Sequence, residues 1–246
     1  MRRLAFFWKG EDTAVPAALV QSARLVYGGT LPIVQLSDRR TPAIAGVTDV
    51  LRGDFSEHVM VGRLDAYSRL GDGPMTVYAD ADCMLLAPLR LPPLGAARAH
   101  LVMRENGMEE VNHLFRGPFP EFAGKTFGQV MPILAALIAV EDGASFFAGL
   151  RDLCLALPER FHRWYGDQVA LAEIYRRNPA SFSLLPARSF LRSIDDPLSE
   201  QDLRKLISIG TRMIHFKGKR SKALAAPALD NLRRVLPESA GSGEPA

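Results

Sequence analysis

The chain opens with apolar runs of strand length separated by a longer amphipathic segment. An apolar run at Leu4–Trp8 is followed by Pro16, a helical stretch over 17–29 that closes on two glycines, and a second apolar run over 31–36. Short apolar runs bounded by turn residues indicate buried strands, and proline near the start and glycine after the end are typical of a helix. Strand, helix and strand joined by short loops predict a βαβ unit and therefore a mostly parallel sheet.

Similar patterns predict elements through the remainder of the chain. Ser56 has the side chain of a helix N-cap, and the stretch 57–70 carries apolar residues at helical spacing before a Gly-Asp-Gly-Pro sequence and a strand over 75–79. Further strands are predicted over 99–105, 181–186 and 212–216, further helices over 143–156, 166–177, 199–207 and 221–236 with an interruption at Pro227, and an irregular loop over 115–128. The pattern predicts an α/β protein with a mostly parallel mixed sheet flanked by helices, in one domain over 1–236. The tail 237–246 has a composition that cannot bury itself and is expected to be disordered.

The composition is that of a globular protein with a mild positive charge. The 246 residues are 48% hydrophobic, which is enough for a sizeable core, and the net charge is +3 with a pI near 9.0. A nucleic-acid-binding protein would show dense basic clusters interleaved with aromatic side chains, so this class is not indicated. A small ligand that bears phosphate fits the charge better.

Neither the cysteines nor the apolar runs indicate export or a membrane span. Cys83 and Cys154 are far apart and lack metal-type spacing, so the sequence indicates neither a disulfide framework nor a zinc site. About five apolar residues precede Lys9, fewer than the roughly 7–15 of a secretory signal, and the apolar stretch 129–140 is shorter than the about 20 residues of a membrane span. We therefore expect a cytoplasmic protein without a transmembrane segment. The basic run 212–222 could be a solvated face or a peripheral contact with anionic lipid, but its alternation with Ile214 and Phe216 favours a strand that leads into a site.

Two carboxylates stand two residues apart at the end of an apolar strand. Asp80 and Asp82 lie in the segment TVYADADCMLL, over 76–86. Side chains at i and i+2 of an extended chain point to the same side, and open α/β sheets bind ligands at the carboxyl ends of strands. Neighbouring carboxylates repel unless one is protonated or a cation lies between them, and oxygen ligands suit Mg²⁺ or Mn²⁺. The alternative is a solvated turn aspartate beside a hydrogen-bonded loop acid.

Three segments carry motif-like residues along the chain. They are RLDAYSRL…VYADADCMLLAPL, then WYGDQVAL over 164–171, and then MIHFKGKRSK over 213–222. In this order they resemble the DxD region, the Asp-Gln motif and the C-terminal His-x-x-Gly-x-x-Lys motif of family-8-like glycosyltransferases with the GT-A fold. The resemblance implies that fold and a metal-dependent transfer of a sugar from a nucleotide diphosphate, with a UDP-sugar favoured, to a glycan or lipid-linked acceptor. It also favours retention of configuration at the sugar.

The resemblance implies roles for five residues. Asp80 and Asp82 would bind Mn²⁺ or Mg²⁺, with His215 as the third ligand and Asp80 also close to the nucleotide. Asp167 and Gln168 would lie near the transferred sugar and act in catalysis. The alternative is that Asp167 only caps the helix that follows, a role that is compatible with a contact to the sugar. Because Asn caps nearly as well, Asp167→Asn is expected to leave the melting temperature unchanged and to lower turnover if Asp167 acts at the sugar.

The resemblance is imperfect where the diphosphate would bind. Gly218 matches the family glycine, but Ser221 stands where the family has a lysine, and the Pro-Trp that usually follows is missing. Lysines at Lys219 and Lys222 and the arginine at Arg220 flank that position. We expect the diphosphate to contact Gly218 and one or more of these basic side chains.

Two other segments are candidates for nucleotide contact. Trp8, Lys9 and Gly10 follow the first strand, where an open sheet binds its ligand, and are expected near the nucleoside. Arg63 lies on the helix before the aspartate pair and is a candidate contact to the nucleotide, with Asp65 supporting it. A surface arginine on an amphipathic helix explains Arg63 nearly as well.

Other functions are compatible with parts of the sequence. The segment DADCM resembles a haloacid-dehalogenase phosphatase motif, but that motif requires Thr or Val where Met84 stands and normally lies on the first strand. A sugar nucleotidyltransferase would need a glycine-rich phosphate loop, which the segment LAFFWKGED lacks. A protein that binds a nucleotide sugar without turnover is the third alternative.

Overall fold

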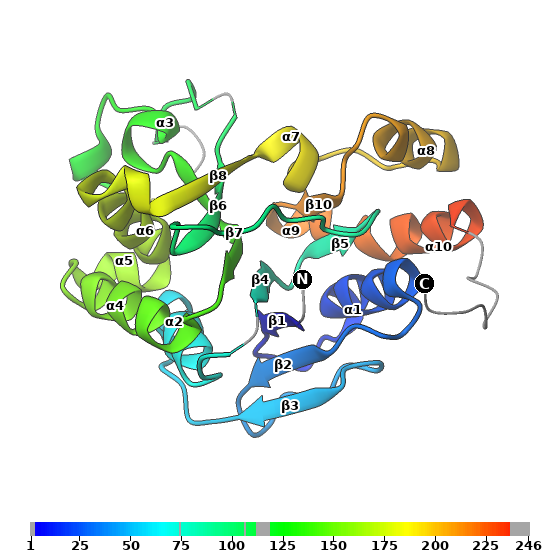
Figure 1. The fold of residues 1–246 in the computed structure, drawn as a ribbon, viewed down its shortest axis with the longest axis horizontal. Coiled ribbons are helices and arrows are strands. Elements are labelled where there is room, and N and C mark those ends of the chain that lie inside the picture. The colour runs from blue at the N-terminus through cyan, green and yellow to red at the C-terminus, as the bar shows by residue number, and fades with distance from the viewer. Residues whose placement is uncertain (1–2, 74, 106, 112–118, 237–246) are drawn as a thin grey trace. The chain divides into compact units, whose positions relative to one another are not determined.

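The structure is a computed structural model that describes residues 3–73, 75–105, 107–111 and 119–236. Its strands are β1 (Arg3–Phe7), β2 (Ile33–Ser37), β3 (Asp49–Arg52), β4 (Thr76–Asp80), β5 (Cys83–Leu85), β6 (Ala99–Met103), β7 (Ile133–Val140), β8 (Phe182–Pro186), β9 (Arg192–Ile194) and β10 (Met213–Phe216). Its helices are α1 (Ala14–Tyr27), α2 (Val59–Ser68), α3 (Phe127–Val130), α4 (Gly143–Leu155), α5 (Glu159–Arg163), α6 (Gly166–Arg177), α7 (Ala187–Phe190), α8 (Glu200–Ser208), α9 (Gly218–Lys222) and α10 (Ala225–Val235), with 3-10 turns η2 (Pro120–Phe122) and η3 (Pro179–Ser181) (Figure 1).

These elements form two sheets and two compact units. The larger sheet has seven strands in the order β3-β2-β1-β4-β7-β6-β8, and the smaller has three in the order β5-β10-β9. Unit 1 comprises Met1–Gly53, Ala79–Leu91 and Ser189–Ala246, and unit 2 comprises Asp54–Tyr78 and Pro92–Arg188. The predicted α/β class with a mostly parallel mixed sheet is confirmed.

Unit 1 begins with the predicted βαβ unit. β1 pairs parallel with β2, Leu4 opposite Ile33, and β2 pairs parallel with β3. Every residue of β2 is buried, as expected of a parallel strand covered on both faces. α1 ends at Tyr27 and is capped by Gly28, whose φ of 58° is the left-handed conformation that glycine adopts at low cost.

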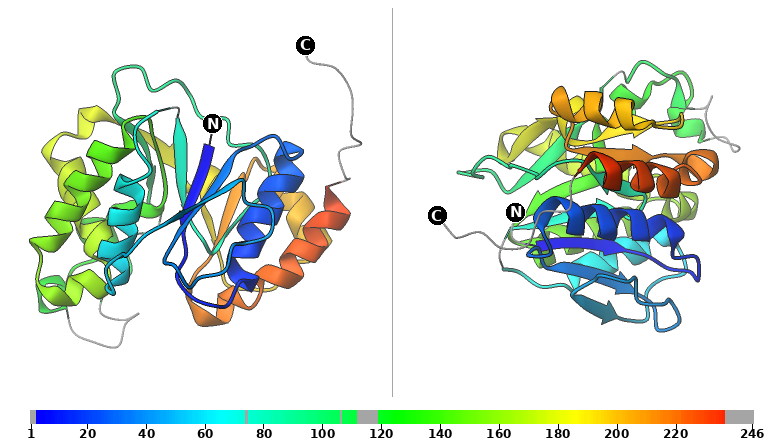
Figure 2. Two further views of the ribbon diagram at one scale, coloured as in Figure 1. Left: turned by 90° about the horizontal axis from the view of Figure 1, so that it is seen from below. Right: turned by 90° about the vertical axis from the view of Figure 1, so that its right-hand side faces the viewer.

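The smaller sheet of unit 1 is held by helices from both ends of the chain. α1 packs against β5 and α10, and α10 packs against α8 (Figure 2). The Ser22 hydroxyl of α1 accepts a hydrogen bond from the Leu85 N–H of β5 at 2.9 Å. α8 begins with a capping box, in which Ser199 and Asp202 satisfy each other's backbone N–H groups. Apolar side chains of β5, β10, α8 and α10 share one buried cluster, which fixes the position of β10 beside β5.

Unit 2 pairs β6 antiparallel with β7 and parallel with β8, and packs α2 against α4 and α4 against α6. Tyr67, Tyr78 and Phe147 form an aromatic cluster in its core, with ring centroids 4.4 to 5.0 Å apart. Gly143 lies beside this cluster, where a Cβ atom would be 2.2 Å from the Tyr78 hydroxyl. The start of α4 is therefore restricted to glycine.

Two boundary predictions are wrong. α2 begins at Val59 after His58, and the Ser56 hydroxyl accepts a hydrogen bond from the His58 N–H within the preceding turn instead of capping the helix. The closing helix is interrupted at Ala223 and Leu224, before Pro227. Pro227 lies in the first turn of α10, where a backbone N–H has no helical partner to lose. The single domain over 1–236 stays a prediction, and the tail lies outside the described residues.

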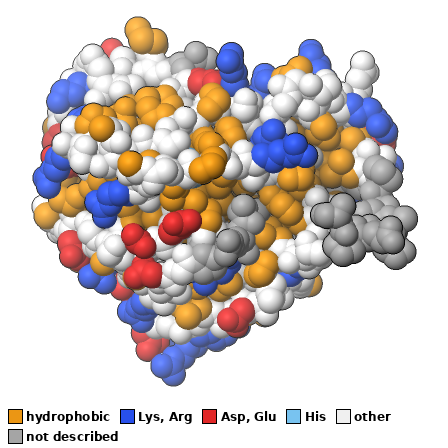
Figure 3. All heavy atoms as spheres, in the orientation of Figure 1, with side chains coloured by type: hydrophobic (Ala, Val, Ile, Leu, Met, Phe, Trp, Pro, Cys, Tyr) orange, Lys and Arg blue, Asp and Glu red, His pale blue; other side chains and the backbone are white. Residues whose placement is uncertain are grey.

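Two further features of the fold are the lengths of its helices and the distribution of charged side chains on its surface. None of the helices within the described ranges is both long enough and apolar enough to cross a membrane. On the face drawn in Figure 3, Lys and Arg side chains lie at several separate places.

Candidate functional site

The chain turns sharply between the two aspartates. Asp80 is the last residue of β4, Ala81 and Asp82 form a turn, and Cys83 begins β5. The prediction that Asp80 and Asp82 point to the same side because the chain is extended between them is therefore wrong. The turn nevertheless leaves both carboxylates near one histidine nitrogen.

His215 reaches the aspartates from the far end of the sequence. β10 pairs antiparallel with β5, so that His215 lies opposite Cys83, and the Phe216 N–H donates to the Asp82 carbonyl oxygen at 2.9 Å. The Nε2 atom of His215 lies 3.0 Å from Asp82 Oδ1 and 3.9 Å from Asp80 Oδ2. The structure thus brings together the three residues predicted to bind a metal, all within unit 1.

Lys222 adds a positive charge to this cluster. Its Nζ atom lies 2.9 Å from Asp82 Oδ2. Ser221, at the position of the expected lysine, is buried and donates a hydrogen bond to a neighbouring carboxylate at 3.2 Å. Gly218, with a φ of 76°, begins the short helix that carries both residues. The backbone of Lys219 belongs to the same helix, whereas its side chain lies outside what the structure describes.

The electrostatics favour a charged carboxylate and a neutral thiol. Burial alone would raise the pKa of Asp82, but His215 and Lys222 outweigh burial and hold that pKa well below its usual range. Burial, together with the charges of Asp82 and Asp80, raises the pKa of the Cys83 thiol well above its usual range. The Nδ1 atom of His215 is buried and has no hydrogen-bond partner among the residues described. Two carboxylates and an imidazole, balanced by a lysine, form a donor set that fits a hard divalent cation.

The three residues predicted near the nucleoside follow β1. The Trp8 N–H donates to the Leu36 carbonyl oxygen at 3.0 Å, and the Gly10 N–H donates to the Thr41 hydroxyl at 3.0 Å. Gly10 has a φ of 139°, which restricts this turn to glycine. The indole Nε1 of Trp8 is shielded from water and has no hydrogen-bond partner within the described part of the chain. Lys9, between them, is half-buried.

The remaining candidates lie in unit 2, where Arg63 of α2 forms an ion pair with Asp167 of α6. Asp167 is only 2% exposed, and its Oδ1 atom accepts a hydrogen bond from the Gln168 N–H at 2.8 Å. Tyr165 is the N-cap residue of α6, so the reading of Asp167 as a cap is wrong. Asp65, expected to support Arg63, pairs instead with two other arginines of unit 2 at 2.6 and 3.2 Å.

Arg104, just after β6, contacts the candidate site residue Gln168 and was not predicted from the sequence. Its guanidinium donates to Gln168 Oε1 at 2.8 Å and to the Met131 carbonyl oxygen at 2.9 Å, and it lies 4.9 Å from the centre of the Phe127 ring. Burial lowers the pKa of Arg104, although Tyr165 raises it in part. Because Arg104 occupies the oxygen of the Gln168 amide, it fixes the direction of the Gln168 NH₂ group. A charged residue directly after a buried strand was the available signal.

The turn before Asp167 and Gln168 is sterically over-determined. Tyr165 adopts a left-handed φ of 63°, which costs a residue with a side chain roughly 1–2 kcal/mol. A Cβ atom on Gly166 would lie 2.3 Å from the Phe161 carbonyl oxygen and 2.6 Å from Cys154 Sγ. Backbone strain of this kind persists where the surrounding structure enforces it, often at functional sites. The first turn of α6 is thereby held in one position.

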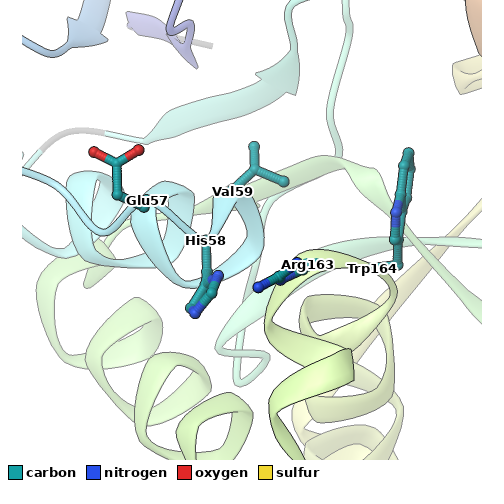
Figure 4. A pocket seen from close by; sticks show the side chains of 5 residues that line it. All are labelled: Glu57, His58, Val59, Arg163 and Trp164. Carbon is teal, nitrogen blue, oxygen red and sulfur yellow. The ribbon is translucent and has the colours of Figure 1, made fainter.

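A hollow of about 400 Å³ lies on the surface of unit 2 and is lined by Glu57, His58, Val59, Arg163 and Trp164. Figure 4 shows His58 and Arg163 approaching each other beneath Val59, with the Trp164 indole standing to one side. Trp164 is 57% exposed, and Val59 is 45% exposed. The hollow thus presents an aromatic ring and an aliphatic group beside ionisable side chains.

Comparisons with known proteins identify this architecture. No protein-family model and no curated protein sequence matches the chain. The solved structure of the galactosyltransferase LgtC, in complex with donor and acceptor sugar analogues, matches with a TM-score of 0.59 at 13% identity, over 95% of this chain and 96% of that one. An active-site mutant of LgtC matches with a TM-score of 0.59 at 12% identity, over 95% and 96% of the two chains. A glycosyltransferase involved in glycosylation of the major capsid of PBCV-1 matches with a TM-score of 0.51 at 9% identity, over 93% and 99%.

Identities this low show a shared fold. The chain has the GT-A fold of these glycosyltransferases, as the resemblance of its three segments predicted.

Proposed function

We propose that this protein is a metal-dependent glycosyltransferase that moves a sugar from a nucleotide diphosphate to an acceptor hydroxyl. The observation that carries the proposal is the convergence of Asp80, Asp82 and His215 in a fold that the chain shares with solved glycosyltransferases. A UDP-sugar as the donor and retention of configuration are proposed from the resemblance of the three segments.

Asp80, Asp82 and His215 would hold Mn²⁺ or Mg²⁺. When bound, the ion would neutralise the negative charge that develops on the departing diphosphate. Asp82 is paired with both His215 and Lys222, so a cation at Asp82 would compete with the Lys222 ammonium. Lys222 would then be free to bind a phosphate oxygen of the donor.

We propose that two other segments complete the donor site, one for the diphosphate and one for the nucleoside. Gly218, with the backbone of Lys219, offers N–H groups at a turn, a feature that suits phosphate oxygens. The nucleoside would lie against Trp8, Lys9 and Gly10 at the carboxyl end of β1. The buried Nε1 of Trp8, without a partner among described residues, supports a polar group of the ligand there.

In unit 2, we propose that the sugar is bound by Gln168 and by the Arg63–Asp167 pair. The Gln168 amide can donate hydrogen bonds to sugar hydroxyls, because its oxygen is occupied by Arg104. The Asp167 carboxylate forms an ion pair with the Arg63 guanidinium, so the proposed role of Asp167 is to hold that guanidinium in place. No separate base near the acceptor is required for retention.

The acceptor is proposed to be a glycan or a lipid-linked sugar. The exposed indole of Trp164 offers a flat apolar face of the kind that packs against sugar rings. Peripheral contact with a membrane would bring a lipid-linked acceptor within reach. Cys83 and Cys154 are both free thiols, which supports a reducing compartment such as the cytoplasm.

Two alternatives are weaker. A phosphatase would use Asp80 as a nucleophile, but Asp80 lies at the end of the fourth strand beside a histidine and a second aspartate, in a fold shared with a solved galactosyltransferase. A nucleotide-sugar-binding protein without turnover would keep the same contacts.

Calorimetric titration with UDP and with uridine, each with and without Mn²⁺, tests the proposed site. We expect Mn²⁺ to tighten UDP binding by at least about tenfold, which is ~1.4 kcal/mol, and to leave uridine unaffected. Lys222→Ala should weaken UDP far more than uridine, whereas Lys205→Ala, an exposed lysine of α8, should change neither. Equal binding of UDP with and without metal would contradict the proposal. Metal-dependent binding without donor hydrolysis would favour the non-catalytic alternative.

A further inference from the structure

Cys83 lies beside the proposed metal ligands Asp82 and His215, although its spacing from Cys154 in the sequence did not suggest a metal ligand. It is completely buried and lies opposite His215 in the antiparallel pairing of β5 with β10. Its Sγ atom, a carboxylate oxygen of Asp82 and a ring nitrogen of His215 all lie within 4.8 Å of one another. The Cys83 thiol therefore lies close to Asp82 and His215, and the Asp80 carboxylate lies 3.9 Å from His215 Nε2.

We propose that Asp82, Cys83 and His215 form a second ligand set that binds a thiophilic divalent cation, with Zn²⁺ as the natural occupant. Carboxylate, thiolate and imidazole are the protein ligands of zinc, whereas Mg²⁺ and Mn²⁺ favour oxygen. The two sets share Asp82 and His215, so one cluster accepts either a hard or a soft ion. Zinc is bound more tightly than manganese by most mixed ligand sets, so Zn²⁺ would displace Mn²⁺.

The geometry requires only a small closure. Ligand atoms of a tetrahedral zinc site are about 3.5 Å apart, given bonds of about 2.0–2.3 Å, and the Asp82–His215 distance of 3.0 Å is already shorter than that. The Cys83 sulfur would move toward the ion. The S–H bond breaks as the Zn–S bond forms, the proton leaves to solvent, and no atom changes oxidation state. Lys222 would leave Asp82, as it must for any cation there.

The alternative is that Cys83 is only a small buried apolar residue. Cys154 provides the matched control, because it is equally buried and belongs to unit 2. Cys83 belongs to a group of three described side chains whose metal-binding atoms lie close together, and Cys154 does not belong to that group. A thiol-specific signal from the metal should therefore come from Cys83 alone.

Titration of the whole protein with Co²⁺, a coloured substitute for Zn²⁺, distinguishes these cases. We expect a thiolate-to-cobalt charge-transfer band that saturates at one ion per chain, disappears in Cys83→Ser and persists in Cys154→Ser. Zn²⁺ affinity should fall by at least about tenfold in Cys83→Ser, while Mn²⁺ affinity stays within about twofold. A band that survives in Cys83→Ser, or no band in the wild type, would overturn the proposal.

X-ray absorption of the zinc-loaded wild type tests the same bond without a variant, in case Cys83→Ser fails to fold. One sulfur neighbour at about 2.3 Å is expected, and a shell of nitrogen and oxygen alone would refute the inference. The inference rests on the cluster and not on sugar transfer. If no nucleotide sugar is turned over but the zinc–sulfur bond is found, the proposed function fails and this site stands.

Discussion

Loss of the Arg63–Asp167 ion pair should cost the protein a large part of its stability. Asp167→Asn keeps the shape of the side chain and the acceptor for the Gln168 N–H, but removes the charge. The Asp167 side chain is 1% exposed and that of Arg63 is 14% exposed, so little water reaches the pair. A buried charge left without its partner costs about 3–5 kcal/mol, compared with about 5–15 kcal/mol for the stability of a whole domain.

A double-mutant cycle measured by urea unfolding tests this magnitude. Asp167→Asn alone should lower the free energy of unfolding by about 3–5 kcal/mol, and adding Arg63→Met should recover roughly 2 kcal/mol of that loss, because no buried charge remains. Asp65→Asn is the control, since Asp65 pairs with Arg69 and Arg151, whose side chains are 47% and 32% exposed. It should cost at most about 1 kcal/mol. A loss below about 1 kcal/mol for Asp167→Asn, with no coupling to Arg63, would refute the buried pair.

Three further outcomes follow from the packing of unit 2. His100 is completely buried, its Nδ1 has no partner among the described residues, and burial lowers its pKa. The unfolded chain takes up this proton near pH ~6.5 and the folded chain only at lower pH, so stability is full above about pH 6.5 and falls below it. Urea unfolding between about pH 8 and about pH 5 should show a shallower loss in His100→Gln, and an equal loss would contradict this role. Gly166→Ala should lower the free energy of unfolding by about 1–3 kcal/mol, because the added Cβ would lie 2.3 Å from a backbone oxygen. Gly149→Ala is the control, since nothing lies close to its added Cβ, and it should raise the free energy of unfolding by up to about 1 kcal/mol. Equal effects of the two changes in thermal unfolding would refute the steric argument. Arg104→Met should lower the kcat of donor hydrolysis by at least about tenfold with unchanged UDP affinity, since it releases the Gln168 amide, and an unchanged kcat would remove Arg104 from the site.

Most of the strands and helices could be predicted from local patterns in the sequence. The apolar runs and glycine stops predicted β1, α1, β2, β4, α4, α6, α8 and β10, because each is stabilised by burial that its own sequence periodicity reveals. The failures lie where two signals compete. Ser56 has the side chain of an N-cap but forms a turn, and Pro227 resembles a break but is tolerated in the first turn of α10.

The site was predicted unevenly for a related reason. Asp82 was predicted from its place after an apolar strand and His215 from the resemblance, although only the pairing of β5 with β10 explains how they meet. Arg104 and Gln168 are 64 residues apart, and no local pattern connects them. Cys83 was set aside on sequence spacing, because spacing cannot show a cross-strand neighbour. Contacts between distant strands are set by tertiary packing, which single-sequence patterns do not contain.

Release of the nucleoside diphosphate from a panel of nucleotide sugars is the most direct test of the proposed activity. The wild type with Mn²⁺ should hydrolyse at least one donor slowly without an acceptor and faster with one. Asp82→Asn should fold normally and lose at least about a hundredfold in turnover, because the ion then lacks a charged ligand where charge develops. Turnover of the wild type that does not depend on a divalent metal, or near-normal metal-dependent turnover in Asp82→Asn, would contradict the assignment of Asp80, Asp82 and His215 as the catalytic metal site.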